Sequence, residues 1–289
     1  NMNSAPVNGI IKINAPSDIT KYVRELRLEN LAPKKTHVYK MFMPELVSKN
    51  MRRFDIEVRL DTGEILRDAH TMFFTIAPYA HKKPVIDGRL GSGEWSSDTW
   101  FSINGRENVQ LLTDSASYMG DADLSGKATA MYDEENVYFF IEIEDDVFVQ
   151  KYTGEQIWNG DSIQIGLSDE TVQNSGTYTE LTVALTSEGP QMYRHLTNSS
   201  ANPTGLMKNA EMQIIRNGTK IYYELAIPWA EVLQKPDRVK AGYVPKFAFL
   251  INDDDGFGRN KYMEYSQTLG AIGTYKNVGF FSDMNLADK

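Results

Sequence analysis

The chain has 289 residues, of which 41% are hydrophobic and 24% are charged, so it is neither disordered nor collagen-like and has the length of about two domains. Its 39 acidic residues outnumber 30 basic ones, and the net charge of −9 argues against a nucleic-acid partner. It has no cysteine, which excludes disulfide bonds and thiolate chemistry. No apolar run reaches the ~20 residues of a membrane-spanning helix, so we expect no membrane partner.

The first 80 residues predict short strands separated by turns. Apolar and polar residues alternate along each of these runs, at residues 38–43, 54–60 and 72–76. The sequence Asp61-Thr62-Gly63 predicts a tight turn between the last two. The polar segment 80–84 ends in proline, and we place a domain boundary there. Residues 1–80 therefore predict a small β-sandwich.

The remaining residues, 84–289, predict a larger all-β domain. Its alternating runs are rich in β-branched and aromatic residues and lie at residues 137–144, 162–167, 177–185, 221–227, 246–251 and 278–281. Asn217-Gly218 between two runs predicts a hairpin. Only residues 228–235, which begin at a proline and stop before another, have a helical pattern. Many strands with almost no helix predict a sandwich or a barrel.

A polar loop that contains Trp158 is a candidate binding site. An aromatic ring on a loop offers a platform for the apolar face of a sugar ring, whereas the sugar hydroxyls need amides and carboxylates nearby. Asn159, Asp161 and Gln164 follow Trp158 and supply such groups. The alternative is that Trp158 closes the open end of the sandwich, because tryptophan is usually mostly buried. We interpret Trp95, Trp100 and Trp229 as core residues.

The segment 252–258 concentrates aspartate and glycine after an apolar strand. Oxygen ligands on a flexible turn suit Ca²⁺, which makes Asp253 and Asp255 candidate ligands of a structural calcium ion. The other interpretation is a tight turn in which Asp and Asn side chains bond to their own backbone. The two interpretations are compatible.

Other chemistry finds weaker support in the sequence. The histidines, at positions 37, 70, 81 and 195, do not pair at metal-ligand spacing, and we interpret them as isolated surface or strand residues. Carboxylates cluster at residues 142–146, and a glycoside hydrolase using that cluster is one alternative. Acidic residues on a solvated sheet face are far commoner.

Several short motifs in order resemble a family 9 carbohydrate-binding module over about residues 84–285. They are VIDG at 85–88, GEW at 93–95, ATAMYD at 128–133, NVYF at 136–139, WNGDSIQI at 158–165, YELAIPW at 223–229 and NDDDG at 252–256. The resemblance implies an antiparallel β-sandwich that binds sugars without cleaving them, with structural calcium ions. Residues 1–80 carry no such motif, and their predicted strands and their position before this module suggest an immunoglobulin-like spacer by analogy of fold.

The resemblance also suggests site residues. In the family two tryptophans enclose the end of a glycan; Trp158 matches the first, and Tyr275 is the aromatic residue nearest to the place of the second. Gln164 stands where the family often has glutamate, so it keeps an acceptor and loses the charge.

The resulting expectation is a monomeric binding segment of a larger bacterial extracellular or surface protein. Its partner would be a plant or cell-wall polysaccharide or oligosaccharide, and its parent protein a glycoside hydrolase or surface protein. Because no tryptophan follows Trp229, a purely structural or protein-interaction spacer is the main alternative. Haem binding is another, although we find no His or Met placed as an axial ligand.

Overall fold

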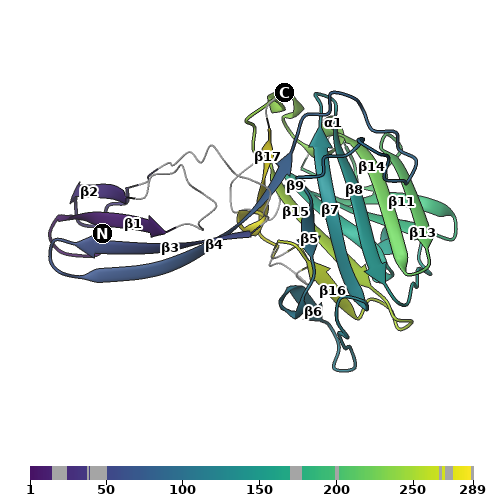
Figure 1. Ribbon diagram of the computed structural model, residues 1–289, viewed down its shortest axis with the longest axis horizontal. Coiled ribbons are helices and arrows are strands. Elements are labelled where there is room, and N and C mark those ends of the chain that lie inside the picture. The colour runs from purple at the N-terminus through teal and green to yellow at the C-terminus, as the bar shows by residue number, and fades with distance from the viewer. Residues whose placement is uncertain are drawn as a thin grey trace. The chain divides into compact units, whose positions relative to one another are not determined.

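The computed structural model describes residues 1–14, 25–37, 39, 51–169, 178–198, 202–266, 269–270 and 276–287, with the backbone alone for 51–53 and 70–74. The chain forms two compact units, Asn1–Phe73 and Phe74–Lys289 (Figure 1). This division precedes the segment 80–84 because the last residues of strand β4 (Ile65–Ala77), from Phe74 to Ala77, pair with strand β17 (Ser282–Leu286) of the second unit.

The described residues of unit 1 form one antiparallel sheet. Its strand order is β2-β1-β3-β4, and the strands not yet given are β1 (Val7–Asn14), β2 (Glu25–Leu31) and β3 (Met51–Leu60). The predicted turn between β3 and β4 is confirmed, since the Leu60 N–H donates to the Glu64 carbonyl at 2.9 Å. The predicted strand 38–43 lies outside the described residues, Tyr39 excepted. The immunoglobulin-like sandwich stays a prediction.

Unit 2 is a β-sandwich, as the sequence predicted, with two sheets stacked face to face (Figure 1). The first sheet runs in the order β13 (Glu211–Asn217), β14 (Lys220–Pro228), β8 (Asn136–Asp145), β7 (Leu124–Tyr132), β5 (Phe101–Ile103). The second runs in the order β12 (Gly205–Leu206), β11 (Gly189–Leu196), β10 (Thr179–Thr186), β9 (Ser162–Ser168), β15 (Lys246–Asp253), β17. β16 (Lys261–Glu264) pairs with β15 and with β6 (Val109–Leu111).

The predicted hairpin is present: Asn217 pairs with Lys220, and Gly218 turns the chain with a φ of +67° that only glycine adopts readily. The predicted helix is the single turn α1 (Trp229–Val232). The predicted strand 278–281 is wrong, because residues Val278–Phe280 form the 3-10 helix η4 and the strand follows at β17. The other 3-10 helices are η1 (Arg106–Asn108), η2 (Gly154–Asn159) and η3 (Pro236–Arg238). None of the helices described here has the length and hydropathy to cross a membrane.

The core lies between the two sheets of unit 2 and is built from one face of each alternating strand. Phe139 on β8 stacks on Phe247 on β15, with 5.4 Å between ring centroids. Ile163, Ile165 and Leu167 on β9 point into the same layer and are at most 1% exposed. The period of two in the sequence therefore identified the inward faces, whose apolar side chains leave water on folding.

The outward face of β9 is buried as well, which a half-exposed strand would not show. A second apolar cluster covers it, made of Tyr178, Ala248, Leu250, Tyr262, Leu269, Val278 and Phe281. Gly166 makes the covering possible, because a Cβ at that position would lie 2.7 Å from the Phe281 ring. The residues after β15 thus form a layer over the second sheet, and the candidate site lies beside that layer.

Candidate functional site

A pocket of about 460 Å³ opens on the outer side of the second sheet. Strands β9, β10 and β11, helix η2 and the covering layer contribute its walls, through Trp158, Gln164, Tyr178, Glu180, His195, Leu196, Arg259, Leu269, Gly270 and Lys276. Alternation along the strands explains the polar floor: Gln164 lies between Ile163 and Ile165, and Glu180 precedes Leu181, so both face away from the core. Antiparallel pairing of Gln164 with Thr182 then brings Gln164 beside Glu180.

Trp158 forms one wall of the pocket and is half-buried. The loop beneath it is held by Gln150, whose side-chain amide donates to the carbonyl oxygens of Ile157 at 2.9 Å and Asp161 at 3.0 Å. Ile157, the residue before Trp158, is fully buried and anchors the same loop. The indole is therefore fixed by its neighbours and keeps part of its surface in the pocket.

Glu180 organises the polar floor. One carboxylate oxygen accepts from Gln164 Nε2 at 2.7 Å and from Lys276 Nζ at 2.6 Å; the other accepts from Lys276 Nζ at 2.7 Å and from the Tyr178 hydroxyl at 3.2 Å. These four contacts fill the acceptor sites of an ionised carboxylate. Glu180 therefore positions its neighbours, whereas Lys276 keeps donor capacity for a ligand.

Arg259 makes cation–π contacts with two aromatic rings, with its guanidinium carbon 4.5 Å from the Tyr262 ring centroid and 5.9 Å from that of Trp158. Its backbone N–H donates to the Asn159 carbonyl at 2.7 Å, which ties it to the loop of Trp158. The side-chain Nε and Nη2 atoms are buried and have no hydrogen-bond partner among the described residues. Burial lowers the pKa of Arg259 to about 10, so the group stays cationic at neutral pH.

His195 completes the polar wall from β11. Its ring lies 4.8 Å from that of Tyr193, and its Nε2 atom is buried without a partner in the described part of the chain. Burial lowers the pKa of His195 and the nearby Glu180 opposes that effect, so the imidazole is neutral at pH 7. A neutral imidazole offers a ligand one donor or acceptor without a charge.

The structure brings together some of the predicted sugar-binding residues. Trp158 and Gln164 both line the pocket. Asn159 is not among the lining residues, and its side-chain amide donates to Gln156 Oε1 at 2.8 Å. Tyr275 lies outside the described residues, whereas its neighbour Lys276 lines the pocket.

Asp161 has a different position from the one that its motif suggested. It is 2% exposed, and its carboxylate accepts from the backbone N–H groups of Val149 and, at 2.7 Å, of Asp254. Burial raises the pKa of Asp161. The side chain joins three segments and is not among the lining residues, so its geometry is that of a loop clamp.

Sequence reasoning missed Glu180, His195, Arg259 and Lys276. The alternation of residues 177–185 placed Glu180 on the face opposite the inward leucines, but nothing in the sequence marked that face as part of a site. Arg259 follows the glycine-rich turn that drew attention for its aspartates. That turn was the one sequence feature that pointed toward Arg259, because it brings the backbone of Arg259 into hydrogen-bond contact with the loop of Trp158.

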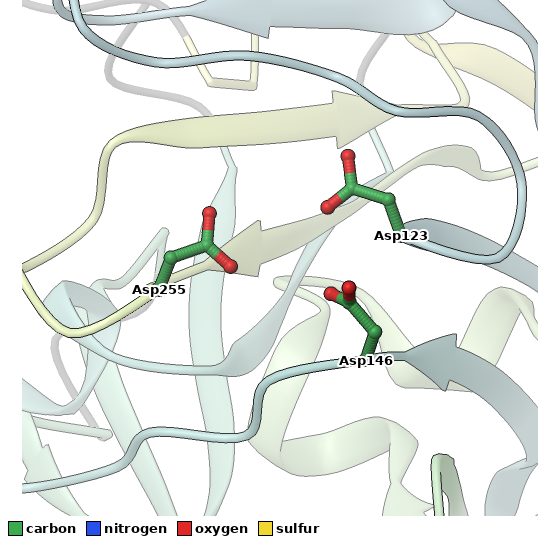
Figure 2. A group of neighbouring side chains, drawn as sticks. All are labelled: Asp123, Asp146 and Asp255. Atoms are coloured by element: carbon green, nitrogen blue, oxygen red, sulfur yellow. The ribbon is translucent and has the colours of Figure 1, made fainter.

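The acidic segment also forms a turn, and Asp254 Oδ1 accepts from the N–H groups of Gly256 at 2.7 Å and Gly258 at 2.8 Å. Of the two predicted metal ligands, Asp255 lies with Asp123 and Asp146, and carboxylate oxygens of these three lie within 4.8 Å of one another (Figure 2). Asp253 is fully buried 3.0 Å from Lys261 Nζ. Burial raises the pKa of Asp253 to about 8.

The three converging carboxylates, shown in Figure 2, have the donor chemistry that a hard divalent cation requires. Lys261 Nζ already lies 3.1 Å from Asp123 and 2.6 Å from Asp255, and so neutralises part of their charge. Its one positive charge does not balance the three carboxylates of Asp123, Asp146 and Asp255. Asp123, Asp146 and Asp255 therefore fit a Ca²⁺ ion better than the predicted pair of Asp253 and Asp255.

Solved structures with a similar fold include two of a family 9 carbohydrate-binding module from Caldicellulosiruptor kristjanssonii. The one in complex with cellotriose has 18% identity and a TM-score of 0.50, and the match covers 75% of this chain and 94% of that one. The one in complex with glucose has 17% identity and a TM-score of 0.49, with 74% and 97% covered. A putative carbohydrate-binding protein from Bacteroides uniformis has 8% identity and a TM-score of 0.44, with 73% and 99% covered.

The comparison with curated proteins gives no match. At the level of families, residues 86–289 match the carbohydrate family 9 binding domain-like family, which is more than half of the chain and nearly all of unit 2. The match agrees with the order of the motifs and with the β-sandwich. The chain belongs to the carbohydrate family 9 binding domain-like family.

Proposed function

We propose that unit 2 binds an oligosaccharide or polysaccharide in the pocket beside Trp158 and does not cleave it. The observation that carries the proposal is a half-buried indole next to buried polar atoms that have no partner among the described residues, at Arg259 and His195. A pyranose has an apolar C–H face that stacks on an aromatic ring and hydroxyls that satisfy such polar atoms. The pocket volume of about 460 Å³ is in the ordinary range for small-ligand sites.

Membership of the family supports a saccharide ligand, and the Caldicellulosiruptor module of the same fold was solved with cellotriose. We further propose that the ligand is a plant or cell-wall glycan. The natural setting would be a bacterial extracellular or surface protein that carries a polysaccharide-degrading enzyme.

The geometry of the carboxylates favours binding without catalysis. A glycoside hydrolase needs two carboxyl groups about 5–10 Å apart across the scissile bond. Among the described residues that line the pocket, Glu180 is the only carboxylate, and its acceptor sites are filled. Glu142, from the other candidate cluster, lies on the first sheet, away from the pocket, where it is bonded to Lys220 at 2.5 Å and lies 3.1 Å from Lys127.

Calcium binding at Asp123, Asp146 and Asp255 is a further part of the proposal. These residues come from the loop before β7, the end of β8 and the turn after β15 (Figure 2). An ion that bound all three would join those segments. The same turn carries Arg259, so a bound ion would also stabilise one wall of the pocket.

Replacing Trp158 by alanine tests the proposed site. We expect titration calorimetry with cello- and xylo-oligosaccharides to show binding by the unaltered chain and binding about 5- to 150-fold weaker by Trp158→Ala, because the lost stacking contributes about 1–3 kcal/mol by analogy with base stacking. Phe257→Ala is the matched control, since this aromatic side chain is 92% exposed on the neighbouring turn. The thermal midpoint should change little in either variant.

Saccharide binding of unchanged affinity in Trp158→Ala would move the site elsewhere. Silence of the folded, unaltered chain across a broad glycan panel would instead support a spacer or a protein-interaction module.

A further inference from the structure

The charges in the pocket do not cancel. Its described lining residues include one carboxylate, Glu180, and two cations, Lys276 and Arg259, while His195 is neutral at pH 7. Glu180 and Lys276 form a direct ion pair with contacts of 2.6 and 2.7 Å. Arg259 makes no direct ion pair among the described residues, and only longer-range attraction to Glu180 and Glu264 offsets its charge, in a protein whose net charge is −9.

One edge of the Arg259 guanidinium has no hydrogen-bond partner among the described residues. The two atoms without a partner among the described residues, Nε and Nη2, form one edge of the planar guanidinium, along which two N–H groups point in parallel. That pair of donors matches the two oxygens of a carboxylate and forms the bidentate contact typical of arginine. Buried N–H groups ordinarily find such a partner within the protein.

The edge is also held in place before any ligand arrives. The guanidinium lies against the Tyr262 ring at 4.5 Å and near the Trp158 ring at 5.9 Å, so its plane has little freedom. The hydrogen bond of 2.7 Å from its backbone N–H to Asn159 fixes the chain on the same side. A donor pair that is fixed in advance loses less conformational freedom on binding.

We propose that the pocket recognises an acidic saccharide, a uronic acid whose carboxylate binds the Nε and Nη2 edge of Arg259 while its ring lies against Trp158. Lys276, whose charge is paired with Glu180, retains a further N–H donor for a ligand in the same pocket. This inference rests on the proposed function and specifies its ligand class. Neutral sugars would offer hydroxyls to Arg259 but no negative charge to pair with it.

The test compares acidic oligosaccharides with their methyl esters, which keep the ring and remove the charge. We expect calorimetry on the full chain to show that oligogalacturonate or a glucuronic-acid-bearing xylo-oligosaccharide binds at least about tenfold more tightly than its ester, as a charge-assisted bidentate contact requires. In Arg259→Gln the acid and the ester should bind alike. Arg259→Lys should recover only part of the preference, because it keeps the charge and loses the paired donors.

Arg216→Gln is the matched control, because that guanidinium also lies over a ring, that of Phe148 at 5.1 Å, but outside this pocket. It should leave the preference for the acid unchanged. The ester comparison on the unaltered chain needs no variant, so it holds even if Arg259→Gln fails to fold.

Equal binding of acids and esters by the unaltered chain would overturn the acidic ligand and leave saccharide binding standing. Binding of sulfated oligosaccharides without binding of uronates would also overturn it. If the folded chain bound neither the acidic nor the neutral members of the panel, the proposed function itself would fail.

Discussion

The hydrogen bonds of Glu180 allow a quantitative test of how the pocket is organised. Replacing it by alanine leaves the Gln164 amide and the Tyr178 hydroxyl without their acceptor and Lys276 without its counter-ion. An unsatisfied buried donor costs about 1–3 kcal/mol. The Lys276 side chain is 25% exposed, so water compensates part of the loss there. We expect the free energy of unfolding to fall by about 2–4 kcal/mol.

Urea unfolding followed by tryptophan fluorescence measures this change. Glu142→Ala is the matched control: it also removes a carboxylate bonded to two lysines, but those lysine side chains are 45% and 46% exposed. Such a surface cluster contributes about 0–1 kcal/mol. Glu180→Gln keeps the shape and one acceptor, so its loss should lie between the two. A loss in Glu180→Ala no larger than in Glu142→Ala would refute the role assigned to Glu180.

Three further outcomes follow from the structure. Burial lowers the pKa of His195 below its usual 6.5, so just below that pH the unfolded state binds more protons than the folded state. The free energy of unfolding therefore falls as the pH drops. In His195→Gln, the difference in thermal midpoint between about pH 7.5 and 5.5 should be smaller than in the unaltered chain. A chelator should lower the thermal midpoint, since calcium at about 100 times its Kd adds about 2.7 kcal/mol to the free energy of unfolding. Asp146→Asn should abolish that response to the chelator. Equal midpoints with calcium and with chelator would contradict the calcium proposal. Gln150→Ala should cost about 1–3 kcal/mol and weaken saccharide binding by freeing the Trp158 loop, whereas Gln156→Ala, at an exposed contact, should do neither in calorimetry and urea unfolding.

Much of the fold of unit 2 could be predicted because its determinants are local. Alternation along residues 137–144 gave the inward face of β8, and the Asn-Gly pair at 217–218 gave the hairpin. The failure at residues 278–281 has a physical cause. Val278 and Phe281 are buried in the layer over the second sheet, and their apolar side chains produced the alternating pattern. The pattern therefore indicated that these residues are buried, although they do not pair as a strand.

The candidate site was only half accessible to sequence reasoning. Trp158 and Gln164 lie close together in the chain, so one motif revealed both. Strand register brings Glu180 beside Gln164, and the residues after β15 bring Arg259 and Lys276 to the pocket. Neither strand register nor the path of those residues can be read from hydrophobic periodicity. Asp161 shared the motif, yet the fold uses its carboxylate to hold backbone N–H groups.

A crystal structure of the chain with a bound oligosaccharide addresses the central claim most directly. We expect a pyranose ring to lie parallel to the indole of Trp158, with ligand oxygens within hydrogen-bond distance of Lys276 and Arg259. A saccharide bound on another surface, with this pocket holding only water, would contradict the account.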